Sequence, residues 1–462
     1  MRWLAALLMM PLAFAMAAEP EQPQPPPAYL PLRFNEDYSY LRDPKLRTDP
    51  FDAAKYLQLR ADDPTWFLSL GGEVRERTEV ISRPDFGFSG RRNSYLLQRL
   101  TLEADLHLGE RVRIFAEGIS GLVWGEEHPA PPPQDDPADL QFAFVDFVPW
   151  ISGEERFTIR LGRFGMSLGS GRLVATRASP NIPFKFDGAE LLYHGANWEA
   201  LAFFTRPGEE RTNGLDLEDD DTTFWGAYLT HWFDAERSRG ADIYYLGLAK
   251  ENSVYASGKA AQHRHSLGLR LFGESGAWDW DAEGVAQFGN FGGDDIRAWT
   301  GSINAGYTWS KVAWQPRLGM KFDVASGDRD PSDGRQETFD PLFFKSGYFN
   351  DASLLRPSNV IDLHPSLTVH PARAVEISGG VDVFWRYSTR DAIYDPPGFI
   401  QIPVTDNRSH YLGTALDVNV SWRLQRHALF STSYVYFFTD NYVASAGGTG
   451  TGFFSATLSL QF

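Results

Sequence analysis

The chain of 462 residues has no cysteine and a formal net charge of −17, which excludes disulfides and thiolate catalysis and argues against nucleic-acid binding. Phenylalanine (34), tyrosine (18), tryptophan (14) and glycine (42) are plentiful, as in barrels with aromatic girdles. Mean hydropathy is −0.33, too polar for a bundle of membrane-spanning helices. After residue 18 no apolar run reaches the ~18 residues that a spanning helix needs.

Residues 1–18 predict a secretory signal peptide. A positive start precedes an apolar run from Leu4 to Ala15, and Ala15-Met16-Ala17 fits a small-x-small cleavage site. Residues 19–65 predict a periplasmic N-terminal segment. Its proline-rich start is followed by the charged stretch 35–63, which has no clear period and is positioned to pack into a barrel mouth.

From Trp66 onward, apolar residues recur at every second position. The end of the chain, FSATLSLQF, shows this best, with one apolar and one polar face. In ending on Phe462 it resembles the closing strand of outer-membrane barrels, and the resemblance implies that this ending is also the assembly address. In earlier segments the polar face carries charges of both signs, which favours a water-filled barrel in lipid. A soluble sandwich, in which a second sheet covers the apolar face, is the alternative.

Residues 66–462 therefore predict an all-β, transmembrane antiparallel barrel of about 18 strands. The predicted strands start near residues 66, 95, 111, 139, 155, 186, 198, 223, 241, 264, 277, 297, 312, 359, 374, 410, 426 and 452. Tight turns such as 109–110 alternate with long polar loops such as 164–185 and 327–358. Short periplasmic turns and long extracellular loops are the pattern of a multi-pass barrel in the outer membrane of a Gram-negative cell.

Arginine outnumbers lysine by 35 to 8, which suits bidentate binding of carboxylate or phosphate. Genome composition, or contacts with lipopolysaccharide phosphates, would also account for this excess. Strict alternation predicts these lumen residues: Arg75, Arg77, Arg99, Arg113, Arg160, Arg270, Arg317, Lys321 and Arg386. The glycine-rich stretch Arg160–Leu191 adds further candidates for the substrate path: Arg163, Arg172, Arg177, Asn181 and Asp187. Arg163 breaks the alternation after Gly162, so its direction depends on a bulge or on the loop turning inward.

Four pieces of sequence carry a family resemblance: NEDYSYLRDP, LSLGGEVRERTE, LGRFGMSLGSGRLV…SPNIPFKFDGAEL and DVASGDRD…ETFDPLFF. In their order and spacing the chain resembles the alginate export family of outer-membrane barrels. The resemblance implies an 18-stranded monomer with an arginine-rich, electropositive constriction that carries a polyanionic uronate polysaccharide outward. By motif it implies path roles for Arg75, Arg77, Arg163, Arg172, Asn181 and Asp187. The late periplasmic turns are short, so a long plug on that side is not expected.

The predicted function is an anion-selective channel that passes an alginate-like polyuronate out of the cell, without enzymatic activity, cofactor or metal. A diffusion porin that takes up small anions or oligosaccharides is the main alternative, and an adhesin barrel with a closed lumen is another. No GxSxG or HExxH motif supports catalysis. The expected partners are outer-membrane lipid, lipopolysaccharide and the polysaccharide, with periplasmic secretion components left open. The acidic run 217–221 is either solvated or a Ca²⁺ ligand set.

Overall fold

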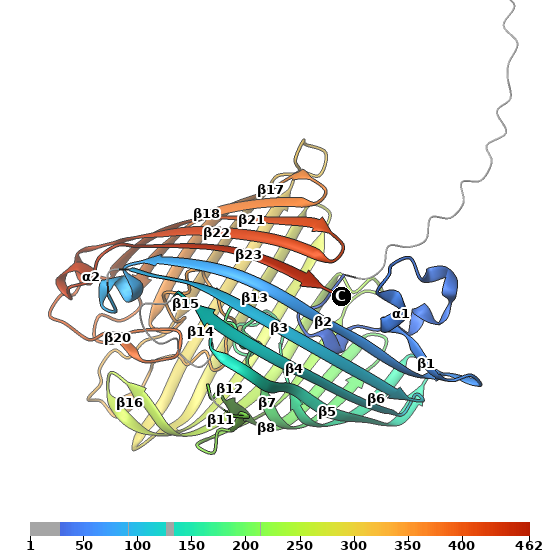
Figure 1. Cartoon of the computed structure of the whole chain (residues 1–462). Coiled ribbons are helices and arrows are strands. Elements are labelled where there is room, and N and C mark those ends of the chain that lie inside the picture. The colour runs from blue at the N-terminus through green and yellow to red at the C-terminus, as the bar shows by residue number, and fades with distance from the viewer. Residues whose placement is uncertain (1–27, 91, 126–133, 213) are drawn as a thin grey trace, which may run out of the picture.

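Eighteen antiparallel strands close into a barrel in the computed structural model, which describes residues 28–90, 92–125, 134–212 and 214–462. The barrel closes because β2 (Asp63–Ser82) pairs with both β3 (Arg92–Leu108) and the last strand, β23 (Thr451–Gln461) (Figure 1). The predicted fold class and strand number are confirmed, although β2 begins three residues before the predicted start at Trp66. The predicted signal peptide lies outside the described residues.

The other barrel strands follow one another around the wall. They are β4 (Val112–Trp124), β5 (Asp136–Ser152), β6 (Glu155–Phe164), β7 (Phe186–His194), β8 (Trp198–Glu209), β10 (Thr222–Trp232), β11 (Arg239–Tyr255), β12 (Gly258–Ser275), β13 (Trp278–Phe291), β14 (Asp294–Thr308), β15 (Arg317–Ala325), β17 (Val360–Ala372), β18 (Val375–Arg386), β21 (Tyr411–Gln425) and β22 (Ala428–Thr439). The remaining elements are β1 (Leu57–Arg60), β9 (Leu217–Glu218), β16 (Arg335–Gln336), β19 (Ile393–Tyr394), β20 (Ile400–Ile402), α1 (Asp52–Lys55), α2 (Asn441–Ser445) and the 3₁₀ turns Arg33–Asn35, Ser39–Arg42, Pro44–Leu46 and Pro84–Gly87. Among the described residues, no helix is long and apolar enough to span a bilayer.

The wall has an apolar outer face and a charged inner face, as the alternation predicts. On β3, Leu100 and Leu102 are 39% and 57% exposed, whereas Arg99 and Glu103 beside them are 8% and 9% exposed. Strand pairing satisfies the backbone hydrogen bonds within the wall, so the apolar outer face can lie in hydrocarbon. Because successive side chains of a strand point to opposite faces, the charged side chains then face the interior.

The two ends of the barrel differ. At one end, which we call the short-turn end, neighbouring strands are joined by tight connections such as 153–154 and 373–374. The opposite, long-loop end carries the connections 165–185, 326–359 and 387–410. Figure 1 shows α1, β1 and the C-terminus at the short-turn end and α2 at the other end. Connection lengths therefore differ between these two ends.

The N-terminal segment, residues 28–62, docks into the short-turn end. Phe34 packs edge-on against Phe144 at a ring-centroid distance of 5.1 Å, and the Arg33 guanidinium lies 3.0 Å from the Glu103 carboxylate of the wall. Lys55 of α1 donates a hydrogen bond of 2.7 Å to the backbone oxygen of Phe462. The segment therefore stabilises the seam between the first and last strands.

Candidate functional site

Two loops of the long-loop end fold into the barrel interior: the β6–β7 loop (165–185) and the β15–β17 loop (326–359). They pair with each other, because Ala175 N donates to Phe343 O at 2.9 Å and Phe343 N donates to Leu173 O at 2.8 Å. We call the paired segments around residues 173–175 and 343 the loop bridge. Neither loop could be assigned to the interior by strand periodicity, which loops lack.

One side of the β6–β7 loop is tied to β2 and β3. The guanidinium of Arg75 donates to the carbonyl oxygens of Ala178 (2.7 Å) and Pro180 (3.0 Å). The Asn181 side chain, which is fully buried, donates to the carbonyl oxygen of Gln98 at 2.8 Å. Buried donors are stable only when they are paired, so these two predicted path residues hold the loop in place.

The other side of the same loop is tied to the opposite wall. Arg172 lies 2.6 Å from Asp323 of β15 and 3.3 Å from Glu283 of β13. All three side chains are at most 5% exposed. The β6–β7 loop therefore crosses the interior, and Arg172 is its charged anchor.

Most of the other predicted path residues form ion pairs inside the barrel. With N–O distances of 2.5–3.4 Å, Arg77 pairs with Glu79 and Asp351, Arg99 with Glu73, Arg113 with Asp105, Arg160 with Asp146 and Glu190, Arg270 with Asp242 and Asp281, Arg317 with Asp279, and Lys321 with Asp323. Because a buried charge must be paired, these cations are largely neutralised by their neighbours. The interior is therefore a network of ion pairs, and only some of its cations are uncompensated.

Two predicted path residues, Arg163 and Asp187, lie on the other face of the wall. The pairing of β6 with β5 and β7 runs through Gly162 without a shift in register, so no bulge turns Arg163 inward. Its neighbour Phe164 faces the interior and is fully buried. Arg163 therefore faces outward at the long-loop end, with Asp187 at 2.8 Å. The prediction that Arg163 and Asp187 line the substrate path is therefore wrong, because the alternation continues unbroken through Gly162.

Arg386 lies inside the wall at the long-loop end, away from solvent. It is fully buried, donates to the carbonyl oxygens of Ser409 and Asn407, and stacks on Tyr442 at 3.5 Å from the ring centroid. These contacts fasten the β18–β21 loop. Arg386 thus lies on the inner face, where other side chains cover it.

Among the described residues, Arg177 has no carboxylate within ion-pair distance. It donates to the carbonyl oxygen of Phe344 at 3.2 Å and lies 5.0 Å from the ring centroid of Phe184. Burial, together with the neighbouring Arg356, lowers the pKa of Arg177 to about 10. Arg177 is therefore still charged at neutral pH and available to an external anion.

A second uncompensated cation, Lys345, lies beside the loop bridge and was not predicted. Three cations surround the ring of Tyr348: Lys321 Nζ at 4.4 Å, Arg172 Cζ at 5.1 Å and Lys345 Nζ at 5.7 Å from its centroid. Lys321 and Arg172 share Asp323, whereas Lys345 is exposed and has no ion pair among the described residues. Its sequence context, a loop without alternation, carried no signal of its direction.

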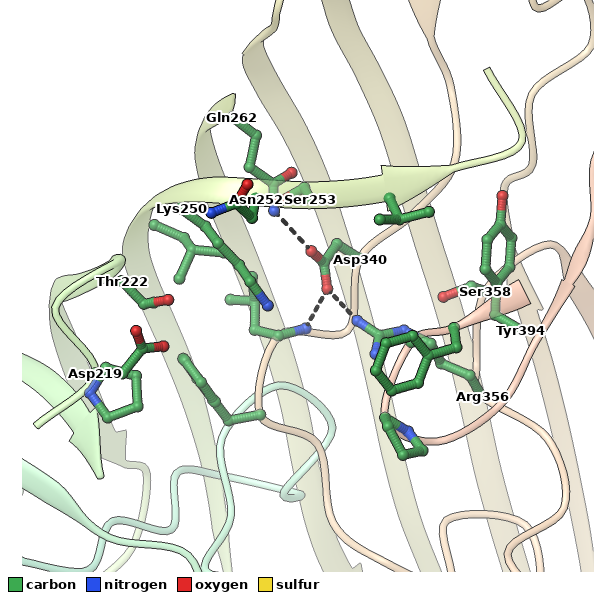
Figure 2. Close-up of a pocket in the computed structure, with 18 of the residues that line it drawn as sticks. Asp219, Thr222, Lys250, Asn252, Ser253, Gln262, Asp340, Arg356, Ser358 and Tyr394 are labelled. Carbon is green, nitrogen blue, oxygen red and sulfur yellow. Dashed lines mark hydrogen bonds and ion pairs between the residues drawn. The ribbon is translucent and has the colours of Figure 1, made fainter. Parts of the chain in front are cut away.

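A cavity of about 390 Å³, which we call the outer pocket, lies on the long-loop side of the loop bridge and is lined by Arg177. Figure 2 shows Lys250 on one side of this pocket and Arg356, which pairs with Asp340 at 2.5 Å, on the other. Tyr255 and Gln262 also donate to Asp340, at 3.0 and 3.2 Å. With Asp340 fully engaged, Arg177 and Lys250 are the cations of this pocket that can meet a ligand.

Two adjoining cavities, of about 580 and 600 Å³, lie at the short-turn end. They share Asn35, Arg156, Thr158 and His194. The second cavity reaches residues 167–169 of the β6–β7 loop. Water-accessible space therefore approaches the β6–β7 loop from the short-turn end, as the outer pocket approaches the loop bridge from the other.

Comparisons with known proteins agree with this architecture. The family model described as alginate export matches residues 67–454, whereas a comparison with curated protein sequences gave no match. A BenF-like porin from Pseudomonas fluorescens Pf-5 is 11% identical, with 86% of this chain and 99% of that chain covered and a TM-score of 0.59. The OccK2 (OpdF) structure from Pseudomonas aeruginosa, in complex with glucuronate, is 11% identical, with 86% of this chain and 98% of that chain covered and a TM-score of 0.58. OccAB1 from Acinetobacter baumannii is 13% identical, with 89% of this chain and 99% of that chain covered and a TM-score of 0.57.

At such identities the solved structures show a shared fold alone, and the family model carries the assignment. It spans most of the barrel, from β2 into β23. The family and the structural neighbours are channels and porins, and the predicted family and outer-membrane location are confirmed. The chain belongs to the alginate export family and is an outer-membrane β-barrel channel.

Proposed function

We propose that this channel passes an anionic polysaccharide of the alginate-like polyuronate class out of the cell. The observation that carries the proposal is the presence of uncompensated cations near the loop bridge. Lys345 lies beside it, and Arg177 and Lys250 line the outer pocket. A barrel of this strand number is wide enough for an aqueous path, so the loops and their charges determine what passes.

We assign the short-turn end to the periplasm and the long loops to the cell surface. This orientation agrees with the connection lengths of other outer-membrane barrels. It places the N-terminal segment and its adjoining cavities where a polymer would enter and where periplasmic secretion components would dock. Outer-membrane lipid and lipopolysaccharide are then the partners of the apolar outer face, and the protein acts as a monomer.

A polyuronate carries one carboxylate per sugar, so it can move between cations in steps. A charge-assisted contact is worth roughly 1–3 kcal/mol before solvent screening, and conduction requires sites that release the polymer as well as bind it. In this proposal the paired arginines, such as Arg77 and Arg99, lend a passing carboxylate transient contacts, and their acidic partners shorten each stay. Lys345 and Arg177 provide the net attraction for anions.

Efflux from proteoliposomes tests this proposal. Vesicles loaded with a labelled oligouronate should release it faster than a neutral oligosaccharide of equal length. In the double variant Lys345→Gln and Arg177→Gln this preference should fall by about thirtyfold, if each lost contact is worth about 1 kcal/mol. The matched control is Arg206→Gln, because Arg206 is exposed and pairs with Asp220 at 2.6 Å. Equal release of charged and neutral sugars by the unmodified channel would contradict the proposal.

A diffusion porin for small anions is the second candidate. It is favoured by one observation, the glucuronate complex of the structurally similar OccK2, because a single uronate would suit the outer pocket of about 390 Å³. The length dependence of efflux separates the two functions. A polymer channel should pass long oligouronates at a rate that falls slowly with length, whereas a porin should show a sharp cut-off after a few sugars.

A further inference from the structure

Three carboxylates converge at the long-loop end of the barrel. Asp136 and Asp139 belong to the start of β5, and Asp216 belongs to the β8–β10 loop. Each offers an oxygen within 4.8 Å of the other two. The side chains are only 2%, 6% and 2% exposed, so solvent does little to screen their mutual repulsion.

The neighbouring cations do not compensate this cluster. Lys185 contacts Asp139, and its Nζ lies 2.5 Å from Asp216. Arg163 is 3.9 Å from Asp139, but it is engaged by Asp187 at 2.8 Å. One ammonium group therefore faces three buried carboxylates.

Asp136 is the side chain that points to a ligand. Neither of its carboxylate oxygens accepts a hydrogen bond from the described residues, although the residue is almost fully buried. An isolated buried carboxylate is costly, whereas the other two acids have Lys185 and backbone donors. Asp216 N, for example, donates to Asp139 at 3.1 Å. The free oxygens of Asp136 and the oxygens of its two neighbours form a set of hard, anionic ligands.

We propose that Asp136, Asp139 and Asp216 bind one Ca²⁺ ion. Ca²⁺ takes six to eight oxygen ligands in flexible geometry, and three carboxylates with backbone oxygens and water can supply them. Mg²⁺ is a poorer fit, because it demands a regular octahedron and keeps its own water. The ion would connect the start of β5 with the β8–β10 loop, which supply its three carboxylates. This role is independent of what the channel carries.

The acidic run that the sequence singles out, residues 217–221, is a different feature. Asp220 pairs with Arg206 at 2.6 Å and its side chain is 85% exposed, and Glu218 also pairs with Arg206. The Asp221 carboxylate accepts a hydrogen bond from Asn252 at 2.9 Å. These acids have partners or water, whereas the proposed site starts one residue before the run, at Asp216, and draws its other ligands from β5.

Calorimetric titration of the folded, lipopolysaccharide-free protein with CaCl₂ in a non-ionic detergent tests the site. We expect one ion per chain with a Kd of about 10⁻⁴–10⁻³ M, the range of extracellular calcium modules. Asp136→Asn should weaken binding by about tenfold or more, because a charged ligand is lost. Asp220→Asn is the matched control and should leave Kd within about twofold, because exposed acids contribute little. Heat-modifiable migration in gels shows whether each variant is folded.

A second measurement on the unmodified protein keeps the test independent of the variants. Chelation of Ca²⁺ should expose the β8–β10 loop to limited proteolysis, and added Ca²⁺ should protect it again, whereas Mg²⁺ at the same concentration should not. The proposal is wrong if the protein takes up no Ca²⁺ at up to about ten times the expected Kd. It is also wrong if Asp136→Asn binds as tightly as the unmodified chain. In either case a proton on Asp136 accounts for its burial.

Discussion

Replacement of Arg172 by methionine should release the β6–β7 loop from the far wall. Arg172 is the residue of this loop that pairs with both Glu283 and Asp323, so the variant removes both charge contacts at once. Methionine keeps an unbranched apolar stem of similar volume and adds no polar group. The expected result is a loop that opens more often while the eighteen-stranded wall stays intact.

The free-energy cost of removing Arg172 depends on the partners that Glu283 and Asp323 keep. Removal of one member of a buried pair costs about 3–5 kcal/mol, because a buried carboxylate is left uncompensated. Here Glu283 keeps a hydrogen bond from Tyr244 at 2.5 Å, and Asp323 keeps Lys321 at 3.1 Å. The lower end of the range therefore applies, and about 3 kcal/mol corresponds to roughly a hundredfold rise in the opening equilibrium.

Hydrogen exchange of the loop-bridge amides measures this opening. The amides of Ala175 and Phe343 should exchange about a hundredfold faster in Arg172→Met, and single-channel conductance should rise because the loop leaves the interior more often. The control Arg206→Met removes an exposed pair, which is worth at most about 1 kcal/mol, and should change neither measurement. Exchange within about threefold of the unmodified protein would show that Arg172 does not anchor the loop.

Three further predictions concern the wall, the second interior loop and the seam. Gly162→Val should reduce the yield of folded barrel in heat-modifiability gels, because Gly162 has φ of 134° and an added Cβ would strike the carbonyl oxygen of Ala143. Burial, with the neighbouring Asp391, raises the pKa of Asp328 to about 7. Between about pH 4 and about pH 7 this carboxyl ionises in the opened loop but stays protonated in the closed loop, so hydrogen-exchange protection of the β15–β17 loop should fall as pH rises through this range. Asp328→Asn should abolish this dependence. Phe462→Asp should impair assembly, measured as folded protein in the outer membrane, because it puts a charge in place of the apolar ring that packs on Phe51 at a centroid distance of 5.6 Å; normal levels would contradict this role.

The strands could be predicted because each one spans a boundary between lipid and water, which imposes an alternation that short stretches of sequence display. The alternation also predicts the inner face for Arg75, Arg99 and Arg160, whose side chains contact the interior loop or carboxylates of the wall. Arg163 shows the limit of this reasoning. A glycine suggested a break in the pattern, but whether the register shifts depends on the neighbouring strands, and here it does not.

The loop bridge could not be predicted, because its contacts join segments that are far apart in the chain. The bond from Arg75 to Ala178 spans 103 residues and that from Arg172 to Asp323 spans 151 residues. Local patterns do not show which carboxylate neutralises which arginine. The uncompensated cations Lys250 and Lys345 were missed for the same reason, since the charge that matters is the one left after pairing.

The selectivity of the single channel in planar bilayers tests the central claim most directly. Charges farther away than a Debye length of about 8–10 Å are screened, so Lys345 and Arg177 should outweigh the overall charge of −17. The reversal potential in a salt gradient should show a preference for anions, and added polyuronate should block the current more than neutral dextran does. A cation-selective channel that is indifferent to polyuronate would contradict the account.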